Sequence, residues 1–493
     1  MIKSERLPNA SKLKGYVALG FVLVFLSAAG CHSKSQQETP DDAANATDLA
    51  PLRLLVIDDP EMATAIQREW LARAGREVVM RNLTTRQLLD GKSSRLGADV
   101  VVYPSGLIGH LATRGLIEPL RVESVMSSPP GSQDVFELSR LREARWGRET
   151  FAVPLGSPQL TLLYRADVFQ KHGLIVPATW DEYRTLVERL ADLQQKGMLF
   201  GGDGGSWNAV IEPLGPGWAG QVLLARAASY AKHRSQFSAL FEYRTMKPLI
   251  TGPAWTRAMG DLHRIADDLP SRVKSFAPSD VRSEFLSGRC AMAMTWPSRA
   301  DDRSKGLAEE ALQIGVAELP GSTAAYNYRS QQWENRGDAA QQHVTLLGVS
   351  GRLGSVTREC RQTHEAVNML TWISGELSSQ ICPESQRTTL FRESHLGQAT
   401  LWVDSQFTQQ AATSYGEVVQ QAMSRPGWLC SVRIPGRHRY LAALDKAVHA
   451  VLDGEASSEE ALAAAAQTWE ETTESLGRDK QREAYMRSIG LEP

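Results

Sequence analysis

Apolar runs that alternate with helical patterns constrain the fold of this chain more than any other feature. Residues 51–57 (PLRLLVI) and 98–103 (ADVVVY) are short apolar runs that read as buried parallel strands. Between them, Met62, Ile66 and Trp70 recur at intervals of four residues, which would place them on one face of a helix. Strands and helices that alternate at this spacing predict a doubly wound α/β sheet.

The same alternation continues through the rest of the chain. Further strands are predicted at 151–155, 160–164, 290–295 and 343–349. Capping-box sequences predict helix starts at Thr179 with Glu182 and at Ser457 with Glu460. About 440 residues follow the N-terminal segment, which is too many for one compact core and predicts two lobes.

The N-terminal segment has the parts of a bacterial export signal and is excluded from the fold. Its start is basic, residues 16–25 are apolar, and small residues precede Cys31. This ending resembles the bacterial lipobox, which implies that residues 1–30 are a lipoprotein signal peptide and that Cys31 is lipidated. The alternative is an uncleaved signal anchor that ends in a chance cysteine. The polar residues 31–50 are predicted to form a flexible tether.

The export signal and the composition limit the location of the protein and the classes of molecule that it is expected to bind. The signal predicts export and a lipid anchor on a bacterial membrane, facing the periplasm or the exterior. The net charge of −2 gives no electrostatic reason to bind nucleic acid. No cysteine or histidine spacing indicates a metal site, so we expect no metal and no cofactor. Four further cysteines could form disulfides or remain buried free thiols, and their spacing does not decide between these states. They are Cys290, Cys360, Cys382 and Cys430.

Hydrolase signatures are missing from the sequence. It contains neither the GxSxG elbow nor the HExxH motif. A secreted glycosidase would need only two carboxyl groups about 5–9.5 Å apart, so it is kept as a remote alternative. We therefore predict a binding protein and not an enzyme.

Polar side chains follow two of the predicted parallel strands. Asp58 and Asp59 come directly after the first strand, and Tyr103 and Ser105 stand at the end of the strand at 98–103. Ligands of open α/β sheets bind beyond the carboxyl ends of strands, so these four residues are candidates for ligand contact. Helix capping by Asp58 and packing by Tyr103 are the structural alternatives.

Five segments carry a recognisable pattern in a recognisable order. They are ADVVVYPSGLIGHLATRGLIEPL at 98–120, FAVPLGSPQLTLLYRADVFQKHGLIVPATWDEYRTL at 151–186, FLSGRCAMAMTWPS at 285–298, HVTLLGVSGRLGS at 343–355, and RYLAALDKAVHAVLDGEASSEEALAAAAQTWEE at 439–471. In this order they resemble the family 1 extracellular solute-binding proteins, the ABC-transporter receptors for sugars and related solutes. Residues 322–341 and 383–402 depart from the pattern of that family.

The resemblance implies a two-lobed periplasmic-binding-protein fold of type II, in which each lobe is a sheet flanked by helices. Lobe 1 would hold residues 52–153 and 343–394, and lobe 2 would hold residues 154–332 and 397–485. The ligand would sit in the cleft, and the lobes would close by a hinge motion.

The implied function is that of a monomeric receptor for an ABC importer. It would capture a small polar solute, with a sugar or oligosaccharide expected, and pass it to the transporter permease. The alternatives are the ligand-binding subunit of a sensor and a receptor for a polyamine or a glycerol phosphate.

Aromatic and polar residues complete the predicted site. Sugar sites combine flat rings, which cover the C–H face of a pyranose, with polar groups that bond its hydroxyls. Trp296 is the first candidate because it follows the strand that resembles the aromatic-bearing edge of the family. Trp207 and Trp218 lie in Gly- and Pro-rich loops, and Ser157 and Asp203 are the remaining polar candidates. The tryptophans ranked lower as ligand contacts are Trp333 and Trp428, and those expected in the core are Trp70, Trp372 and Trp469.

Overall fold

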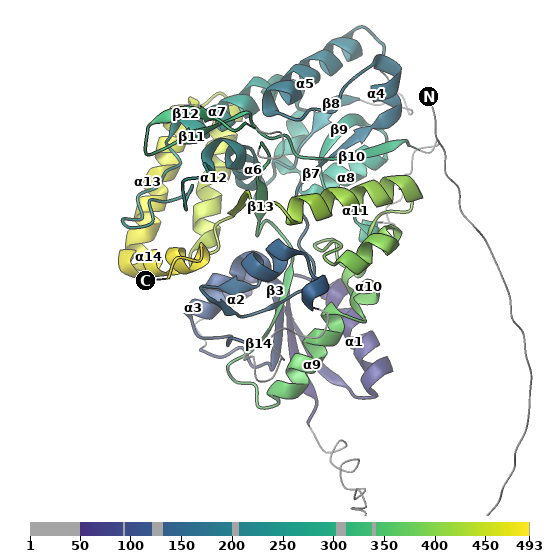
Figure 1. Ribbon diagram of the computed structural model, residues 1–493, viewed down its shortest axis with the longest axis vertical. Coiled ribbons are helices and arrows are strands. Elements are labelled where there is room, and N and C mark those ends of the chain that lie inside the picture. Colours follow the sequence, from purple (N-terminus) through teal and green to yellow (C-terminus); the bar gives the residue numbers. More distant parts are fainter. Residues whose placement is uncertain are drawn as a thin grey trace, which may run out of the picture. The chain divides into compact units, whose positions relative to one another are not determined.

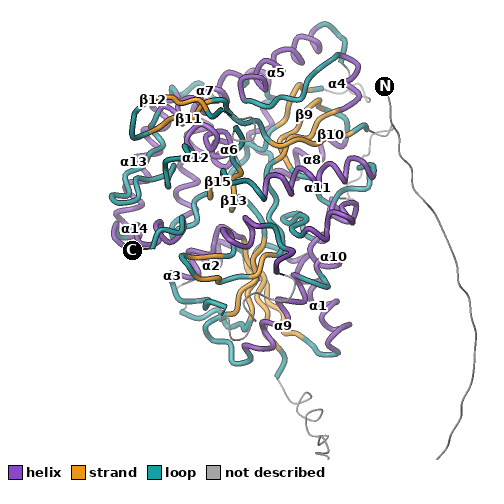
Figure 2. The backbone as a smooth tube through the Cα atoms, viewed as in Figure 1, coloured by secondary structure: helices purple, strands orange, loops and turns teal. Residues whose placement is uncertain are grey.

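The computed structural model describes residues 50–91, 94–120, 132–199, 207–301, 312–337 and 342–492. The predicted signal peptide, most of the tether and the lipidation site at Cys31 lie outside the described residues. Two main β-sheets flanked by helices make up the unit that starts at Pro51, which confirms the predicted α/β class (Figures 1 and 2).

The first sheet has five strands in the order β2-β1-β3-β14-β6. Strand β1 is parallel to β2 and β3, with Leu54 opposite Val100, and β14 is antiparallel to β3 and β6. The strand bounds are β1 Leu52–Ile57, β2 Val78–Leu83, β3 Val100–Pro104, β6 Val153–Pro154 and β14 Arg352–Val356. Helices that accompany this sheet are α1 Pro60–Ala74, α2 Thr85–Asp90, α3 Ile108–Thr113, α9 Thr363–Ser374 and α10 Ser378–Ile381.

Helix α1 shows how local sequence sets these elements. The Asp59 side chain accepts a hydrogen bond from the Met62 backbone N–H at 3.2 Å, which caps the first turn. Pro60 follows as the first helical residue, where its missing N–H costs nothing. Gly75 ends the helix in the left-handed conformation at φ 60°. The apolar face of the helix packs on the sheet through Ile66 and its neighbours.

The second sheet has four strands in the order β10-β7-β9-β8. Strand β8 is parallel to β9, whereas β7 is antiparallel to both β9 and β10. The strand bounds are β7 Thr161–Arg165, β8 Asn208–Ile211, β9 Cys290–Thr295 and β10 Ile314–Glu318. Every residue of β9 is buried, as its uninterrupted apolar run predicts.

The remaining helices form two groups, one that packs on the second sheet and one whose members pack on one another. Helix α11 packs against β10, α8 against β9 and α5 against β8. The helix bounds are α4 Ala166–His172, α5 Trp180–Gln195, α6 Ala219–Ala231, α7 Pro253–Arg264, α8 Pro278–Leu286, α11 Gln409–Met423, α12 Arg437–Leu452, α13 Ser458–Leu476 and α14 Arg478–Ser488. The capping boxes predicted at Thr179 and Ser457 are confirmed at the starts of α5 and α13.

Several stretches of chain pass between the parts that carry the two sheets, and two of them matter for the site. Residues 155–160 lead from β6 to β7, and the chain returns from β13 to β14 (Figure 1). The short ladders that complete the structure are β4 Arg145–Trp146 with β5 Glu149–Thr150, β11 Ala324–Asn327 with β12 Gln332–Asn335, and β13 Thr345–Leu347 with β15 Trp428–Cys430. The polar segment that departs from the family pattern contributes the β11–β12 hairpin.

The four cysteines whose pairing could not be decided from their spacing are free thiols in the structure, and all but Cys360 are buried. Burial raises the pKa of the Cys290 and Cys382 thiols, which keeps them protonated.

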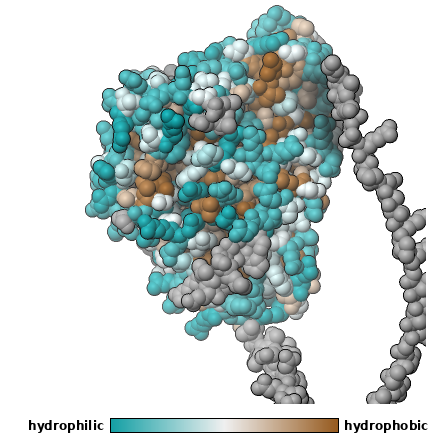
Figure 3. All heavy atoms as spheres, viewed as in Figure 1, coloured by the Kyte–Doolittle hydropathy of each residue, from teal (hydrophilic) through white to brown (hydrophobic). Residues whose placement is uncertain are grey.

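None of the helices in the described ranges combines the length and the apolarity that a membrane crossing requires. On the face drawn in Figure 3, hydrophilic residues predominate and apolar residues form smaller groups between them.

Candidate functional site

Asp58 and Asp59 lie at the carboxyl end of β1, as predicted, and both carboxylates bind other parts of the protein. Asp58 adopts a left-handed backbone conformation at φ 56°. Its carboxylate accepts hydrogen bonds from the backbone N–H of Thr85 at 2.9 Å and from the Thr85 hydroxyl. Asp58 thus ties the end of β1 to the start of α2.

Asp59 belongs to a buried ion pair. Its Oδ2 accepts hydrogen bonds from Arg352 Nε at 2.7 Å and from the Ser385 hydroxyl at 2.5 Å. The Arg352 side chain is 1% exposed, and burial lowers the pKa of its guanidinium. Arg352 Nη2 also donates to the Asp58 carbonyl at 2.9 Å. The helix cap that the alternative placed at Asp58 is supplied by its neighbour Asp59. Ligand contact by Asp58 or Asp59 stays a prediction.

The hydroxyl candidates lie in the interior beside the first sheet. Tyr103 is fully buried, and its hydroxyl is 2.8 Å from the Ser355 hydroxyl. Burial raises its pKa, so the phenol stays neutral. The Ser105 and Ser157 hydroxyls donate to the same Ser350 carbonyl at 2.6 and 3.4 Å, so the structure brings these two predicted residues together.

Ser157 also contacts a buried carboxyl group that sequence reasoning missed. Its hydroxyl lies 2.6 Å from Glu143 Oε1, which accepts a second bond from the Gly348 N–H at 3.0 Å. Burial raises the pKa of Glu143, and the bond from Ser157 opposes part of that rise. No sequence pattern marks Glu143, because only Ser139 among its partners lies in the same segment, and Ser157 and Gly348 come from elsewhere in the chain.

Trp218 and Trp296 form an aromatic pair at the edge of the second sheet. Their ring centroids are 5.7 Å apart with an interplanar angle of 48°. Trp296 follows β9 and is 2% exposed, whereas Trp218 is half-buried just before α6. The carboxylate of Asp445 accepts from the Gly217 N–H at 2.7 Å and holds the loop that carries Trp218. The guanidinium of Arg282 lies 5.4 Å from the Trp296 ring centroid.

A short segment connects this aromatic pair to the first sheet. Trp296 Nε1 donates to the Gln386 carbonyl at 3.0 Å, and the preceding residue, Ser385, bonds Asp59. The predicted site residues Asp59, beside the first sheet, and Trp296, beside the second, are thereby joined through the adjacent loop residues Ser385 and Gln386. The side chains of Gln386 and Arg387 are exposed on this loop. We call Trp218, Trp296, Gln386 and Arg387 the junction site.

Sequence reasoning missed Gln386 and Arg387 because they lie in residues 383–402, which lack a family pattern. The structure separates Trp207 from the junction site. Trp207 precedes β8, whereas Trp296 follows β9, and parallel strands place these positions at opposite edges of the sheet. Trp207 is buried, and its carbonyl accepts from Gln194 Nε2 at 2.5 Å. Asp203 lies outside the described residues.

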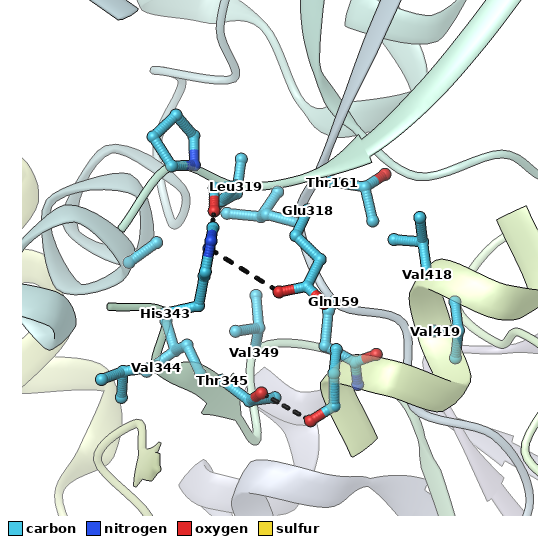
Figure 4. A pocket seen from close by; sticks show the side chains of 15 residues that line it. Gln159, Thr161, Glu318, Leu319, His343, Val344, Thr345, Val349, Val418 and Val419 are labelled. Carbon is cyan, nitrogen blue, oxygen red and sulfur yellow. Dashed lines mark hydrogen bonds and ion pairs between the residues drawn. The ribbon is translucent and has the colours of Figure 1, made fainter. Parts of the chain in front are cut away.

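A small pocket lies beside both crossing stretches (Figure 4). Its volume of about 40 Å³ gives room for about three water molecules. Gln159 donates from Nε2 to the Ser157 carbonyl at 2.5 Å, and its Oε1 is buried without a hydrogen-bond partner. The residues that Figure 4 labels around this pocket also include Thr161, Val344, Thr345, Val349, Val418 and Val419.

The other polar groups of this pocket bind one another. His343 Nδ1 lies 3.0 Å from the Leu319 carbonyl and 3.7 Å from the Glu318 carboxylate (Figure 4). Glu318 also accepts a two-pronged bond from the Arg425 guanidinium at 2.7 and 3.1 Å. In the described ranges, no group of three or more His, Cys, Asp or Glu side chains could hold a metal ion.

Comparison with known proteins identifies the family of the chain and its fold. The sequence profile described as "Bacterial extracellular solute-binding protein" matches residues 84–350. No curated protein matches the chain at a significant level.

Several solved structures share the fold. An ABC-transporter solute-binding protein from Agrobacterium radiobacter K84, in complex with ribitol, is 18% identical with a TM-score of 0.63, covering 85% of this chain and 98% of its own. The sugar-binding protein MalE from Xanthomonas citri is 16% identical with a TM-score of 0.63, covering 87% and 98%. Maltose-bound MalE3 from T. maritima is 16% identical with a TM-score of 0.60, covering 85% and 99%. At these identities the likeness establishes the two-lobed periplasmic-binding-protein fold.

Proposed function

Because the chain belongs to the bacterial extracellular solute-binding proteins, we propose that it captures a sugar or polyol and delivers it to the permease of an ABC importer. Solved relatives of the same fold hold ribitol, maltose and D-mannitol. Such ligands carry hydroxyl groups for hydrogen bonds, and pyranoses also have apolar C–H faces for aromatic rings. The receptor binds its solute and leaves it chemically unchanged.

The single observation that supports a carbohydrate ligand is the pairing of Trp218 and Trp296 beyond the carboxyl end of β9. Trp218 is the accessible member of the pair, so its ring is free to cover a sugar face. Gln386 and Arg387 carry exposed polar side chains on the loop that contacts Trp296, and such groups can hydrogen-bond the hydroxyls of a sugar.

Ligand capture requires two bodies that move relative to each other. We assign lobe 1 to residues 52–153 and 348–394, and lobe 2 to residues 154–332, 343–347 and 397–485, because β13 pairs with β15. The crossing stretches at 155–160 and between β13 and β14 would serve as the hinge. Binding energy drives closure only to the extent that the solute contacts the closed state better than the open one.

The location of the receptor follows from its N-terminus. The family is extracellular, so the protein is exported. Lipidation at Cys31 would hold it on the membrane surface beside its permease, and residues 31–50 would give it reach.

A thermal-shift screen with sugars and polyols tests the proposal. A ligand at 100 times its Kd stabilises the native state by about 2.7 kcal/mol, which raises the melting temperature measurably. If pentitols, hexitols, maltose and longer maltodextrins all leave the melting curve unchanged, the carbohydrate assignment is wrong.

The Kd of the ligand identified in this screen is then measured for the wild type and for Trp218→Ala. We expect Kd to rise at least about tenfold, or about 1.4 kcal/mol, because the ring that covers the sugar is gone. Trp372→Ala is the matched control, since Trp372 is also half-buried and pairs with Trp70 at 5.3 Å and 51°. Equal Kd values in both variants would remove Trp218 from the site. Trp296→Ala is less informative, because truncating a buried tryptophan costs about 3–5 kcal/mol of stability.

A further inference from the structure

A second pocket is rich in arginine and lies apart from the junction site. It has a volume of about 280 Å³, and five of its lining residues are arginines. We call it the arginine pocket and define it by Arg142, Arg145, Arg148, Arg433, Arg487 and Trp428. A chain with a net charge of −2 has no general excess of positive charge, so this concentration is local.

Three segments that are distant in sequence form the walls of this pocket. Arg142, Arg145 and Arg148 come from the turn before β4 and from the β4–β5 hairpin, and Arg487 comes from the last turn of α14. The Gly147 N–H donates to the Arg487 carbonyl at 3.1 Å, which ties the hairpin to α14. Arg433 Nη2 donates to the Ser488 carbonyl at 2.6 Å. The hydrogen bonds hold the charges together before any ligand arrives.

Two guanidinium groups of the pocket are incompletely satisfied. Arg433 is buried and donates only to backbone carbonyls, at 2.9 Å to Arg142 and 2.6 Å to Ser488. Its Nε is buried without a hydrogen-bond partner, as is the Nε of Arg145. Buried donors without partners are rare in proteins, so both guanidinium groups keep hydrogen-bonding capacity that the protein itself does not use.

Carboxylates neutralise little of this charge. Glu492 lies 3.7 Å from Arg148, and Glu483 lies 3.7 Å from Arg487, both in partly exposed pairs. Within the described part of the chain, no carboxylate comes within ion-pair distance of Arg142, Arg145 or Arg433. The nearby Glu143 carboxyl group accepts its hydrogen bonds from Ser139, Ser157 and Gly348, and the charge of Arg433 opposes part of the rise in the pKa of Glu143 that burial causes.

Trp428 adds a flat wall to the pocket. The Arg142 guanidinium stacks over its ring at 4.7 Å from the centroid, and Lys232 Nζ lies 5.8 Å from the same ring. This stacking places the Arg142 charge at the pocket while leaving the side chain exposed.

We propose that the arginine pocket binds a small, multiply charged oxyanion of the phosphate type, at a site separate from the sugar site. A planar carboxylate is satisfied by one guanidinium fork, whereas a tetrahedral anion offers oxygens to several forks that approach from different directions. Arginines on a hairpin, after β15 and on α14 provide these directions.

Calorimetric titration of the purified protein with sodium phosphate tests the proposal. Sodium chloride at the same ionic strength is the reference, because screening alone affects both salts equally. We expect saturable binding of phosphate and none of chloride, together with a change in tryptophan fluorescence from Trp428. Phosphate heats that match those of chloride would overturn the proposal.

Charge-removing variants locate the binding. Arg142→Gln is exposed and should fold, so it is made alone and with Arg145→Gln. We expect the phosphate Kd to rise at least about tenfold in the single variant and binding to disappear in the double variant. Arg86→Gln, on the exposed face of α2, is the matched control and should keep the wild-type Kd. Phosphate binding that survives in the double variant would place the anion elsewhere and refute the assignment.

Discussion

At the scale of single residues, the carboxyl ends of the strands hold charges that the protein uses for its own stability. Asp59 accepts bonds from Arg352, from Ser385 and from the first turn of α1. Both ionic side chains are almost completely buried. In such a pair, the loss of one partner costs more than the pair itself contributes, because the other charge stays behind without compensation.

Asp59→Ala should therefore destabilise the protein by about 3–5 kcal/mol, measured by urea unfolding. The exposed pair of Arg86 and Asp90, with side chains 91% and 74% accessible, supplies the control. Asp90→Ala should cost less than about 1 kcal/mol. A loss below about 1 kcal/mol in Asp59→Ala would mean that the buried pair contributes little.

His395 makes stability depend on pH. Its Nδ1 accepts from the Phe391 N–H at 3.3 Å, which places the proton on Nε2, 3.0 Å from the Ser378 hydroxyl. Burial, with a smaller effect of Arg392, lowers its pKa to about 3. The unfolded state binds a proton near the ordinary pKa of 6.5, so this contribution to stability is complete above that pH and declines as the pH falls toward 3.

Urea unfolding at a series of pH values checks this behaviour. Between pH 6.5 and pH 3, His395 should add up to about 1.4 kcal/mol per pH unit to the slope of stability against pH. His395→Gln should remove that part of the slope. His364→Gln, at a side chain that is 79% exposed, should leave the slope unchanged. Identical slopes in the wild type and His395→Gln would contradict the assignment.

At the scale of elements, helix starts depend on side chains that lie within one turn. Ser457 accepts from the Glu460 N–H at 3.2 Å, and Glu460 accepts from the Ser457 N–H at 2.9 Å. This reciprocal box opens α13, and the hydrogen bonds from Ser457 lower the pKa of Glu460. The arrangement is exposed, so its effect on stability comes from satisfied helix donors and not from burial.

Ser457→Ala should cost about 1 kcal/mol, because one N–H of the first turn loses its acceptor. Ser458→Ala, one residue further along, is the matched control and should stay within about 0.5 kcal/mol of the wild type. Thermal unfolding of the two variants under identical conditions gives the comparison. If both serines cost the same, the capping bond is not what stabilises the start of α13.

At the scale of the whole molecule, the first sheet is assembled from both halves of the chain. Strand β14 lies between β3 and β6 and pairs with each. Without it, β3 would present an unpaired edge in the middle of the sheet. The first lobe therefore depends on residues that are synthesised long after its first strands.

A fragment of residues 50–342 should consequently fail to fold cooperatively, as measured by circular dichroism during thermal melting. Co-expression with residues 343–493 should restore a cooperative transition and ligand binding, because β14 can then insert. A cooperative melt of the first fragment alone would show that the first sheet is stable without β14.

Local sequence patterns were sufficient to predict several strands and helix starts correctly. The apolar runs at 98–103 and 290–295 became β3 and β9, because a strand buried on both faces needs an uninterrupted apolar sequence. The boxes at Thr179 and Ser457 became helix starts, because all of their bonds lie within four residues. The placement of Trp296 at the end of β9 followed from the same local reading.

Only the tertiary structure decided which distant groups meet. Asp59 and Arg352 are 293 positions apart, and the loop that joins Asp59 to Trp296 lies in a segment without a recognisable pattern. The arginine pocket gathers three segments in the same way. Such contacts depend on the order and direction of the strands, which residues far apart set together and which no local periodicity encodes.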